Sequence, residues 1–226
     1  MQQVYEGGEL DLFREARRWK SYWRRTLAPW IRGSVLEVGA GTGSNTELLR
    51  DLGTSWTCLE PNPAFCDRMR SMALRADIVC GSTGDLPLAP HDTILYLDAL
   101  EHILDDREEL ERARARLGPG GHLVVLAPAH GWLYSPFDRQ VGHHRRYDLR
   151  SLRAVAPPAT REVWMGYLDA VGMSASAANR VLLSQSLPTA RQLAWWDRYM
   201  VPLSERVDPW LRHRVGKSVV AVWGAR

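Results

Sequence analysis

The chain has 226 residues, 45% of them hydrophobic, which is enough for one packed α/β domain and argues against disorder as its main state. Its 29 Lys and Arg residues against 26 Asp and Glu residues leave a net charge of +3, so no broad nucleic-acid-binding face is indicated. The three cysteines, Cys58, Cys66 and Cys80, are odd in number and lack metal-ligand spacing. They favour a reducing cytoplasm and give no support for a metal site.

The N-terminal segment is charged from its first residues and has no apolar run that could serve as a signal peptide or cross a bilayer. Large apolar side chains recur near helical spacing as far as Pro29; they are Leu10, Leu12, Phe13, Trp19, Tyr22, Trp23 and Leu27. We therefore expect a helical cap over residues 1–32. Its aromatic residues, with Tyr5, could close over a ligand, although an amphipathic helix that covers a sheet accounts for most of them equally well.

Residues 33–128 alternate short apolar runs with helical patterns. Strands are expected at SVLEV, SWTCLEP, ADIVCGS, TILYLDA and HLVVLAP, and helices over 46–52, after Pro63 and over 105–117. Apolar strands that alternate with helices form a parallel sheet covered on both faces. The fold class predicted is therefore α/β.

The pattern changes beyond Pro128. A polar and aromatic loop covers residues 129–150, further strands are expected at REVWMGY and KSVVAVWG, and about fifty residues lie between those two strands, far more than a strand connection needs. Such an insertion is typical of a lid or substrate cover. We expect a single domain, 1–226, made of the helical cap (1–32), a core (33–128) and a C-terminal part (129–226).

A glycine-rich turn follows the first core strand. In VLEVGAGTGSNT, Gly39, Gly41 and Gly43 let the backbone turn sharply and approach a ligand closely. Glu60 ends the second strand, 19 positions after Gly41, where its carboxylate can accept hydrogen bonds from the two hydroxyls of a ribose. The two features predict a nucleoside-binding crevice. The dinucleotide fingerprint G-x-G-x-x-G does not fit, because Ser44 stands at its third glycine.

The motifs E-V-G-A-G-T-G and LEP resemble the class I S-adenosylmethionine-dependent methyltransferases. GSTGDLP, LYLDALEHILDD and LGPGGHLVVLAP extend the resemblance over residues 34–128. It implies a Rossmann-like, seven-stranded, mostly parallel sheet with helices on both faces, and S-adenosylmethionine as the cofactor. It also implies that the glycine turn holds the methionine part of the cofactor, that the acid holds the ribose, and that the segment after the third strand frames the adenine.

On this resemblance, the residues expected to bind the cofactor are Glu37, Gly39, Ala40, Gly41, Gly43, Asn45, Glu60, Pro61, Ser82, Thr83, Asp98 and Ala99. Glu37 could instead support the turn from within its strand. For the acceptor side, the expected residues are His102, Arg145, Arg146 and Tyr147. His102 fits a helix-start residue packed under the sheet equally well.

The stretch FDRQVGHHRRYDLR is the candidate for the catalytic machinery. It resembles an F-D-x-x-x-G-H-x-R-R-Y segment of a bacterial methyltransferase subgroup associated with glycan, lipid or secondary-metabolite pathways. An oxygen or amine acceptor is helped by a nearby base, commonly histidine, and His143 matches the histidine of that segment. We expect His143 to be the general base. Adjacent side chains diverge in an extended chain, so His143 and His144 are not expected to share a metal ion, and His144 should be exposed.

Arg145 and Arg146 leave two alternatives open. They could grip a carboxylate or phosphate of the acceptor through paired donors, or they could pair with Asp138 and Asp148 and fix the loop. Tyr147 could orient a group or simply pack. The C-terminal insertion is also open, because Trp195, Trp196, Tyr199 and Trp210 could line an acceptor pocket, rest on a membrane surface, form a dimer interface or, as aromatic helical faces more often do, pack in the core.

The sequence therefore predicts a cytoplasmic methyltransferase that acts on a small or medium-sized acceptor, preferably at an oxygen, in a biosynthetic pathway. The acceptor is anionic if the arginines bind it, no nucleic acid or metal is expected, and the protein is a monomer or a homodimer. Two alternatives remain, namely an RNA or protein methyltransferase and a cofactor-binding protein without catalysis. The first would need a broad charged docking face, and the intact glycines and Glu60 count against the second.

Overall fold

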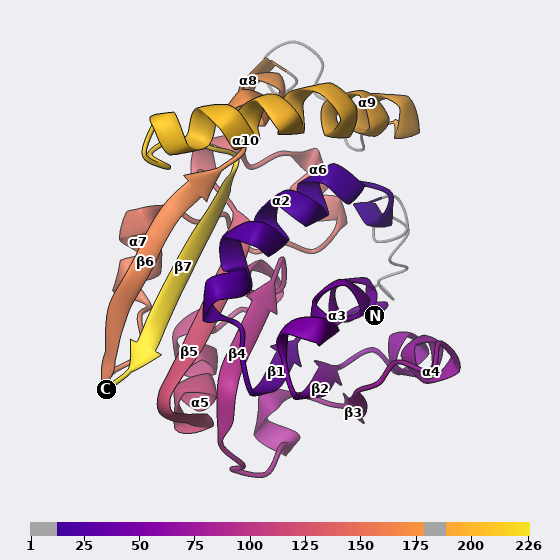
Figure 1. Cartoon of the computed structure of the whole chain (residues 1–226), viewed down its shortest axis with the longest axis vertical. Helices are drawn as coiled ribbons and strands as arrows, with labels where there is room; N and C mark the ends of the chain where they lie inside the picture. Colours follow the sequence, from indigo (N-terminus) through magenta and orange to yellow (C-terminus); the bar gives the residue numbers. More distant parts are fainter. Residues whose placement is uncertain (1–12, 179–188) are drawn as a thin grey trace.

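The computed structural model describes residues 13–178 and 189–226 (Figure 1). The expected cap residues Tyr5, Leu10 and Leu12 lie outside this part of the chain. Among the described residues, no helix is both long and apolar enough to cross a membrane.

A seven-stranded sheet forms the centre of the molecule, with the strand order β3-β2-β1-β4-β5-β7-β6. The strands are β1 (Ser34–Val38), β2 (Ser55–Glu60), β3 (Asp77–Cys80), β4 (His91–Leu97), β5 (Leu117–Pro128), β6 (Thr160–Leu168) and β7 (Ser218–Ala225). The first five pair in parallel, and β7 runs antiparallel between β5 and β6. The predicted seven-stranded, mostly parallel sheet is confirmed.

Helices cover both faces of the sheet (Figure 1). Their bounds are α2 (Arg17–Leu27), α3 (Ser44–Leu49), α4 (Pro63–Ser71), α5 (Asp106–Ala115), α6 (Pro136–Gln140), α7 (Leu149–Ala154), α8 (Ala170–Ala178), α9 (Ala190–Trp195), the π-helical η7 (Trp196–Met200) and α10 (Val201–Trp210). Side chains of α5 and α7 pack in the core on one face, while α2, α3 and the C-terminal insertion pack on the other. The expected helix over 46–52 ends earlier as an α-helix, because its last turn, Arg50–Leu52, is a 3-10 turn.

The cap helix α2 is strongly amphipathic. It buries Trp19, Tyr22, Trp23 and Leu27 against the sheet and ends just before the Ala28–Trp30 turn that contains Pro29. Arg24 and Arg25 lie in its last turn, where positive charge interacts favourably with the helix dipole.

The C-terminal insertion contains α8, α9, η7 and α10 and lies beyond the carboxyl ends of the parallel strands (Figure 1). The buried carboxylate of Asp208 ties it to the cap, accepting hydrogen bonds from the Tyr22 hydroxyl at 2.7 Å and from the backbone N–H of Asp169 at 2.6 Å. The expectation that its aromatic residues pack in the core holds for Trp196 but is wrong for three others. Trp195, Tyr199 and Trp210 are exposed, because they lie on the outer side of the helices.

Candidate active site

The carboxyl ends of β1, β2 and β4 bring the predicted cofactor residues to one edge of the sheet. Val38, the last residue of β1, pairs with Leu59 on one side and with Tyr96 on the other. Glu60 and Asp98 therefore flank the glycine turn that follows β1. This edge of an open α/β sheet is where such folds bind ligands.

The glycine turn needs glycine for two separate reasons. Gly39, Gly41 and Gly43 have φ values of 71°, 55° and 76°, a left-handed conformation that other residues rarely adopt. At Gly39 space is also short, because a Cβ added there would lie 2.7 Å from the Cβ of Ala99. Ala99 follows β4, so two strand ends approach each other closely at this point.

Glu60 is buried and oriented by the backbone around it. One carboxylate oxygen accepts the Gly41 N–H at 2.8 Å, and the other accepts the Asn62 N–H at 2.9 Å. Burial raises the pKa of Glu60, against the lowering effect of these two hydrogen bonds. Because each carboxylate oxygen can accept more than one hydrogen bond, Glu60 can still accept from the hydroxyls of a ribose.

Glu37 lies under the glycine turn, fully enclosed, and accepts a hydrogen bond from the Thr46 hydroxyl at 2.6 Å. Burial raises the pKa of Glu37 to about 7. The contact with Thr46 favours the alternative role considered for Glu37, a support of the turn.

Lys20 of α2 is a site residue that the sequence pattern did not reveal. Its ammonium donates to Ser44 at 2.8 Å and to Asn45 at 3.0 Å, so it connects the cap to the start of α3. Burial lowers the pKa of Lys20 to about 8, in spite of the attraction of Glu37 and Asp98. The only signal in the sequence was its rarity, since the chain has just one other lysine, Lys217.

The segment after β3 has one exposed and one buried hydroxyl. Ser82 is exposed and caps the Thr83–Asp85 turn together with Asp85, whose carboxylate accepts from both the N–H and the hydroxyl of Ser82. Thr83 is buried and donates to Glu109 of α5 at 2.6 Å. The Thr83 hydroxyl proton is thus used inside the protein.

Asp98 adopts a left-handed conformation with φ 52°, which is uncommon for a residue other than glycine and concentrates at functional sites. Asp98 is exposed, but protein atoms around its carboxyl displace water and raise its pKa to about 6, although His143 and Lys20 both attract its charged form. Asp98 thus connects the cofactor edge electrostatically with the loop that carries His143.

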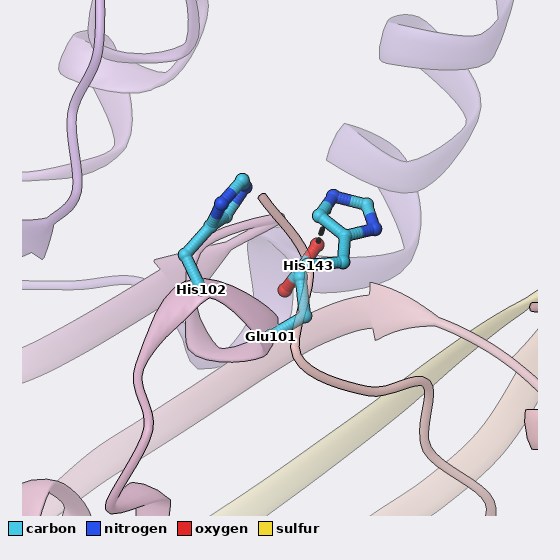
Figure 2. A group of neighbouring side chains, drawn as sticks. All are labelled: Glu101, His102 and His143. Atoms are coloured by element: carbon cyan, nitrogen blue, oxygen red, sulfur yellow. Dashed lines mark ion pairs between the residues drawn. The ribbon is translucent and has the colours of Figure 1, made fainter. Parts of the chain in front are cut away.

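His143 meets two residues that follow β4, as Figure 2 shows. Its Nε2 lies 3.8 Å from Oε1 of Glu101, and its ring stands nearly perpendicular to that of His102, with 4.6 Å between the ring centroids. A backbone hydrogen bond from His144 to the Glu101 carbonyl, 2.8 Å long, holds the two segments together. The side chain of His144 is exposed, as expected.

On its other side, His143 is held by Asp138 of α6. The Nδ1 atom lies 2.9 Å from Oδ1 of Asp138, and Arg146 binds both oxygens of the same carboxylate, at 2.8 Å and 2.9 Å. Asp138 also accepts from the N–H and the hydroxyl of Ser135. Burial alone would raise the pKa of Asp138, but the hydrogen bonds from His143 and Arg146 hold it well below its usual range.

Glu101 differs from Asp138, because within residues 13–178 and 189–226 no hydrogen-bond donor reaches either of its buried carboxylate oxygens. Burial raises the pKa of Glu101 well above its usual range, and the nearby charge of Asp98 raises it further. Burial also lowers the pKa of His102 to about 4, with a further contribution from His143.

Arg145 and Arg146 both form ion pairs with acidic residues of the protein itself. Arg146 binds Asp138, and Arg145 binds Asp106 at 2.7 Å. Tyr147 is 1% exposed and donates its hydroxyl to Asp106 at 2.8 Å. These contacts favour the loop-fixing alternative. Of the two acids considered as partners, only Asp138 binds an arginine of the pair; Asp148 instead accepts the N–H of Ser151 and caps α7.

Comparison with known proteins places this site in a family. The model of a family described as "Methyltransferase domain" matches residues 12–198, which is most of the chain. The chain therefore belongs to this family. By this membership, the chain contains a methyltransferase domain.

Two curated relatives agree with this assignment. The chain is 30% identical over 96 residues to a probable S-adenosylmethionine-dependent methyltransferase of Mycolicibacterium smegmatis, which covers 42% of this chain and 37% of that protein. It is also 30% identical over 118 residues to a demethylmenaquinone methyltransferase of Tropheryma whipplei, with 49% of each chain covered. The chain thus matches about half, or less, of the length of these relatives.

Solved structures share the fold over nearly the whole chain. The N-methyltransferase NodS of Bradyrhizobium japonicum, solved with S-adenosyl-L-homocysteine, has a TM-score of 0.58 at 16% identity, covering 94% of this chain and 87% of NodS. A putative methyltransferase from a Haloferax volcanii complex with the activator Trm112 has a TM-score of 0.66 at 15% identity, covering 98% of this chain and 96% of that one. At these identities, the likeness shows the fold alone.

Proposed function

We propose that the protein transfers the methyl group of S-adenosylmethionine to an oxygen of a small or medium-sized acceptor in a secondary-metabolite, glycan or lipid pathway. The observation that carries this proposal is the setting of His143, whose Nδ1 is held by the Asp138 carboxylate while Nε2 faces Glu101 and His102. A hydroxyl acceptor must lose its proton, and an imidazole held in this way can take it.

The residues at the carboxyl edge suit the cofactor. The backbone of Gly39, Gly41 and Gly43 would hold its methionine part, and Glu60 would accept hydrogen bonds from its ribose. Lys20 holds Ser44 and Asn45 at the start of α3, so it keeps the turn in place. When bound, the cofactor supplies a methyl group on a positively charged sulfur, which is its own leaving group.

The protein must then position the acceptor oxygen in line with the sulfur–carbon bond and remove its proton. In this proposal, Nε2 of His143 is the general base. Asp138 keeps the proton of the neutral imidazole on Nδ1 and stabilises the imidazolium that forms when Nε2 takes a second proton. Arg146 holds Asp138 in turn.

Calorimetry with S-adenosylmethionine tests the cofactor site of the purified protein. We expect one molecule bound per chain, and we expect Glu60→Ala to weaken the binding at least tenfold. A panel of phenols, sugar hydroxyls, carboxylates and amines then tests the acceptor class, with S-adenosylhomocysteine as the measured product.

We expect His143→Ala to abolish turnover while the cofactor affinity is kept. The control is His144→Ala, which removes a neighbouring but exposed imidazole and should leave turnover unchanged. Full activity of His143→Ala would reject His143 as the base, and methyl transfer confined to the amines would reject an oxygen acceptor.

A further inference from the structure

Glu101, His102 and His143 form a cluster of potential metal ligands. Each of the three offers one ligand atom, and these atoms all lie within 4.8 Å of one another (Figure 2). Two come from the turn η4 (Leu100–His102), and the third comes from the loop after α6. The cluster is therefore assembled by the fold and not by a local sequence motif.

The carboxylate of Glu101 has no hydrogen-bond donor within the described part of the chain, and its side chain is fully buried. An ionised carboxylate without a partner costs several kcal/mol in such surroundings. A cation in the cluster would remove this cost, because it would bind the oxygens that no donor reaches.

The imidazole of His143 has a lone pair toward the same space. Because Asp138 accepts from Nδ1, the proton of the neutral ring lies on that atom, and Nε2 faces Oε1 of Glu101 across 3.8 Å. When the Glu101 carboxyl is ionised, two acceptor atoms therefore face each other. A carboxylate that holds the far nitrogen of a histidine is also the usual support of a metal-bound imidazole, and Asp138 is itself fixed by Arg146 and Ser135.

We propose that Glu101, His102 and His143 bind one divalent transition-metal ion, and that the acceptor oxygen occupies its open coordination position. Two imidazoles and one carboxylate suit zinc, iron(II), cobalt(II) or manganese(II) better than magnesium or calcium. Three atoms within 4.8 Å of one another share a point no more than about 2.8 Å from each. Inward movements of less than about 1 Å would give normal metal–ligand distances.

The role of this ion rests on the proposed methyl transfer and replaces one step of it, the removal of the acceptor proton by His143. With the ion bound, His143 is a ligand rather than the proton acceptor, and the ion lowers the pKa of the coordinated hydroxyl. The oxygen–hydrogen bond breaks and the proton passes to solvent. An oxygen lone pair then forms the bond to the methyl carbon, and the electron pair of the broken carbon–sulfur bond stays on sulfur.

Metal binding can be measured without any acceptor. The full chain is stripped with a chelator, dialysed and titrated with cobalt(II), whose visible absorption reports the coordination. We expect one ion per chain, displaced by zinc(II) and unaffected by a large excess of magnesium. Glu101→Gln and His102→Ala should each weaken cobalt binding at least tenfold. His144→Ala is the control, because His144 is exposed, and it should leave cobalt binding unchanged. Thermal melts show whether each variant is folded. If one of the two cluster variants fails to fold, the other still tests the site.

Cobalt binding by Glu101→Gln and His102→Ala that equals that of His144→Ala would overturn the proposal, as would a wild-type chain that binds no ion. Calorimetry with S-adenosylmethionine on the same samples separates the two proposals. Cofactor binding and methyl transfer by the chelated protein would overturn the metal site and leave the proposed function standing. Conversely, a bound ion without methyl transfer to any acceptor would support the site and reject the function.

Discussion

The imidazole of His143 is fixed by the carboxylate of Asp138, with 2.9 Å between Nδ1 and Oδ1. Asp138 is fully buried and also binds the guanidinium of Arg146, so a single carboxylate sets the position of both side chains. Asp138 therefore fixes both ends of the stretch from His143 to Arg146. This arrangement also distinguishes His143, the proposed general base, from the residues that hold its side chain.

Replacing Asp138 by Asn tests whether this carboxylate positions His143 without contributing to cofactor binding. The amide cannot neutralise Arg146, and it no longer holds His143 as firmly. We expect turnover to fall about 10- to 100-fold, with the affinity for S-adenosylmethionine unchanged. Stability should fall by about 3 kcal/mol, because a buried charge loses its partner. Steady-state kinetics, calorimetry and urea denaturation measure the three quantities.

Asp148→Asn is the matched control for this substitution. It changes another acid of the same segment to its amide, but Asp148 only caps α7, and Asn is an equally good cap. An Asp138→Asn variant whose turnover equals that of Asp148→Asn would show that turnover does not depend on Asp138 holding the imidazole of His143.

Replacing Gly39 by Ala tests the glycine turn. Its left-handed φ of 71° costs a residue with a side chain about 1–2 kcal/mol. The added methyl would also meet the Cβ of Ala99 at 2.7 Å, so the turn must shift. We expect a loss of at least tenfold in S-adenosylmethionine affinity, measured by calorimetry on the folded variant.

Gly131→Ala is the control, because nothing lies within 4 Å of a Cβ added there and its φ is not in the left-handed range. Cofactor binding should be unchanged in this variant. Equal affinities of Gly39→Ala and Gly131→Ala would exclude the turn from the cofactor site.

The sheet and its cofactor edge could be predicted because their signals are local. Apolar runs, the turn glycines and Glu60 can each be recognised from a few neighbouring residues. The topology of parallel α/β sheets then brings the strand ends together. The cluster of Glu101, His102 and His143 lacks any such signal. His102 and His143 lie far apart in the sequence, and their contact depends on the η4 turn and on a backbone hydrogen bond from His144.

The partner of Arg145 could not be predicted from the sequence either. Asp148 was the nearer acid in the sequence, but the side chain of Asp148 caps the first turn of α7 and is therefore occupied. The spacing from Asp148 to Ser151 is that of a capping box, so the capping role of Asp148 could have been recognised from the sequence. That Asp106 would lie beside Arg145 could not, because it depends on how α5 packs against the loop.

Replacing Tyr147 by Phe distinguishes a packing role from an acceptor contact. The hydroxyl is buried and donates to Asp106, which keeps its contact with Arg145 when the hydroxyl is removed. We expect a loss of about 2 kcal/mol in the free energy of unfolding, the usual range for a hydrogen bond to a charged group. The acceptor KM and kcat should not change.

The control is Tyr199→Phe, which removes the hydroxyl of an exposed ring and should change neither quantity. An increased acceptor KM for Tyr147→Phe, with stability unchanged, would instead assign Tyr147 to substrate binding.

Replacing Glu37 by Gln makes stability less sensitive to pH. Burial raises the pKa of Glu37 from 4.5 to about 7 in the folded protein, so the folded state binds the proton more tightly than the unfolded state does. Below pH 4.5 the carboxyl is protonated in both states and there is no penalty. As the pH rises toward 7, the wild-type chain loses stability, and above 7 the penalty becomes constant. Gln is neutral throughout and can still accept from Thr46.

We therefore expect the stability of Glu37→Gln relative to wild type to rise by about 2.5 kcal/mol between pH 5 and pH 8, measured by urea denaturation at both values. Glu47→Gln is the control, since Glu47 is exposed and its ion pair with Arg14 lies at the surface. Its difference from wild type should stay nearly constant between the two pH values. If the stability difference between Glu37→Gln and wild type is also the same at both pH values, Glu37 keeps an ordinary pKa under the turn. Lys20 would then stabilise its charged form.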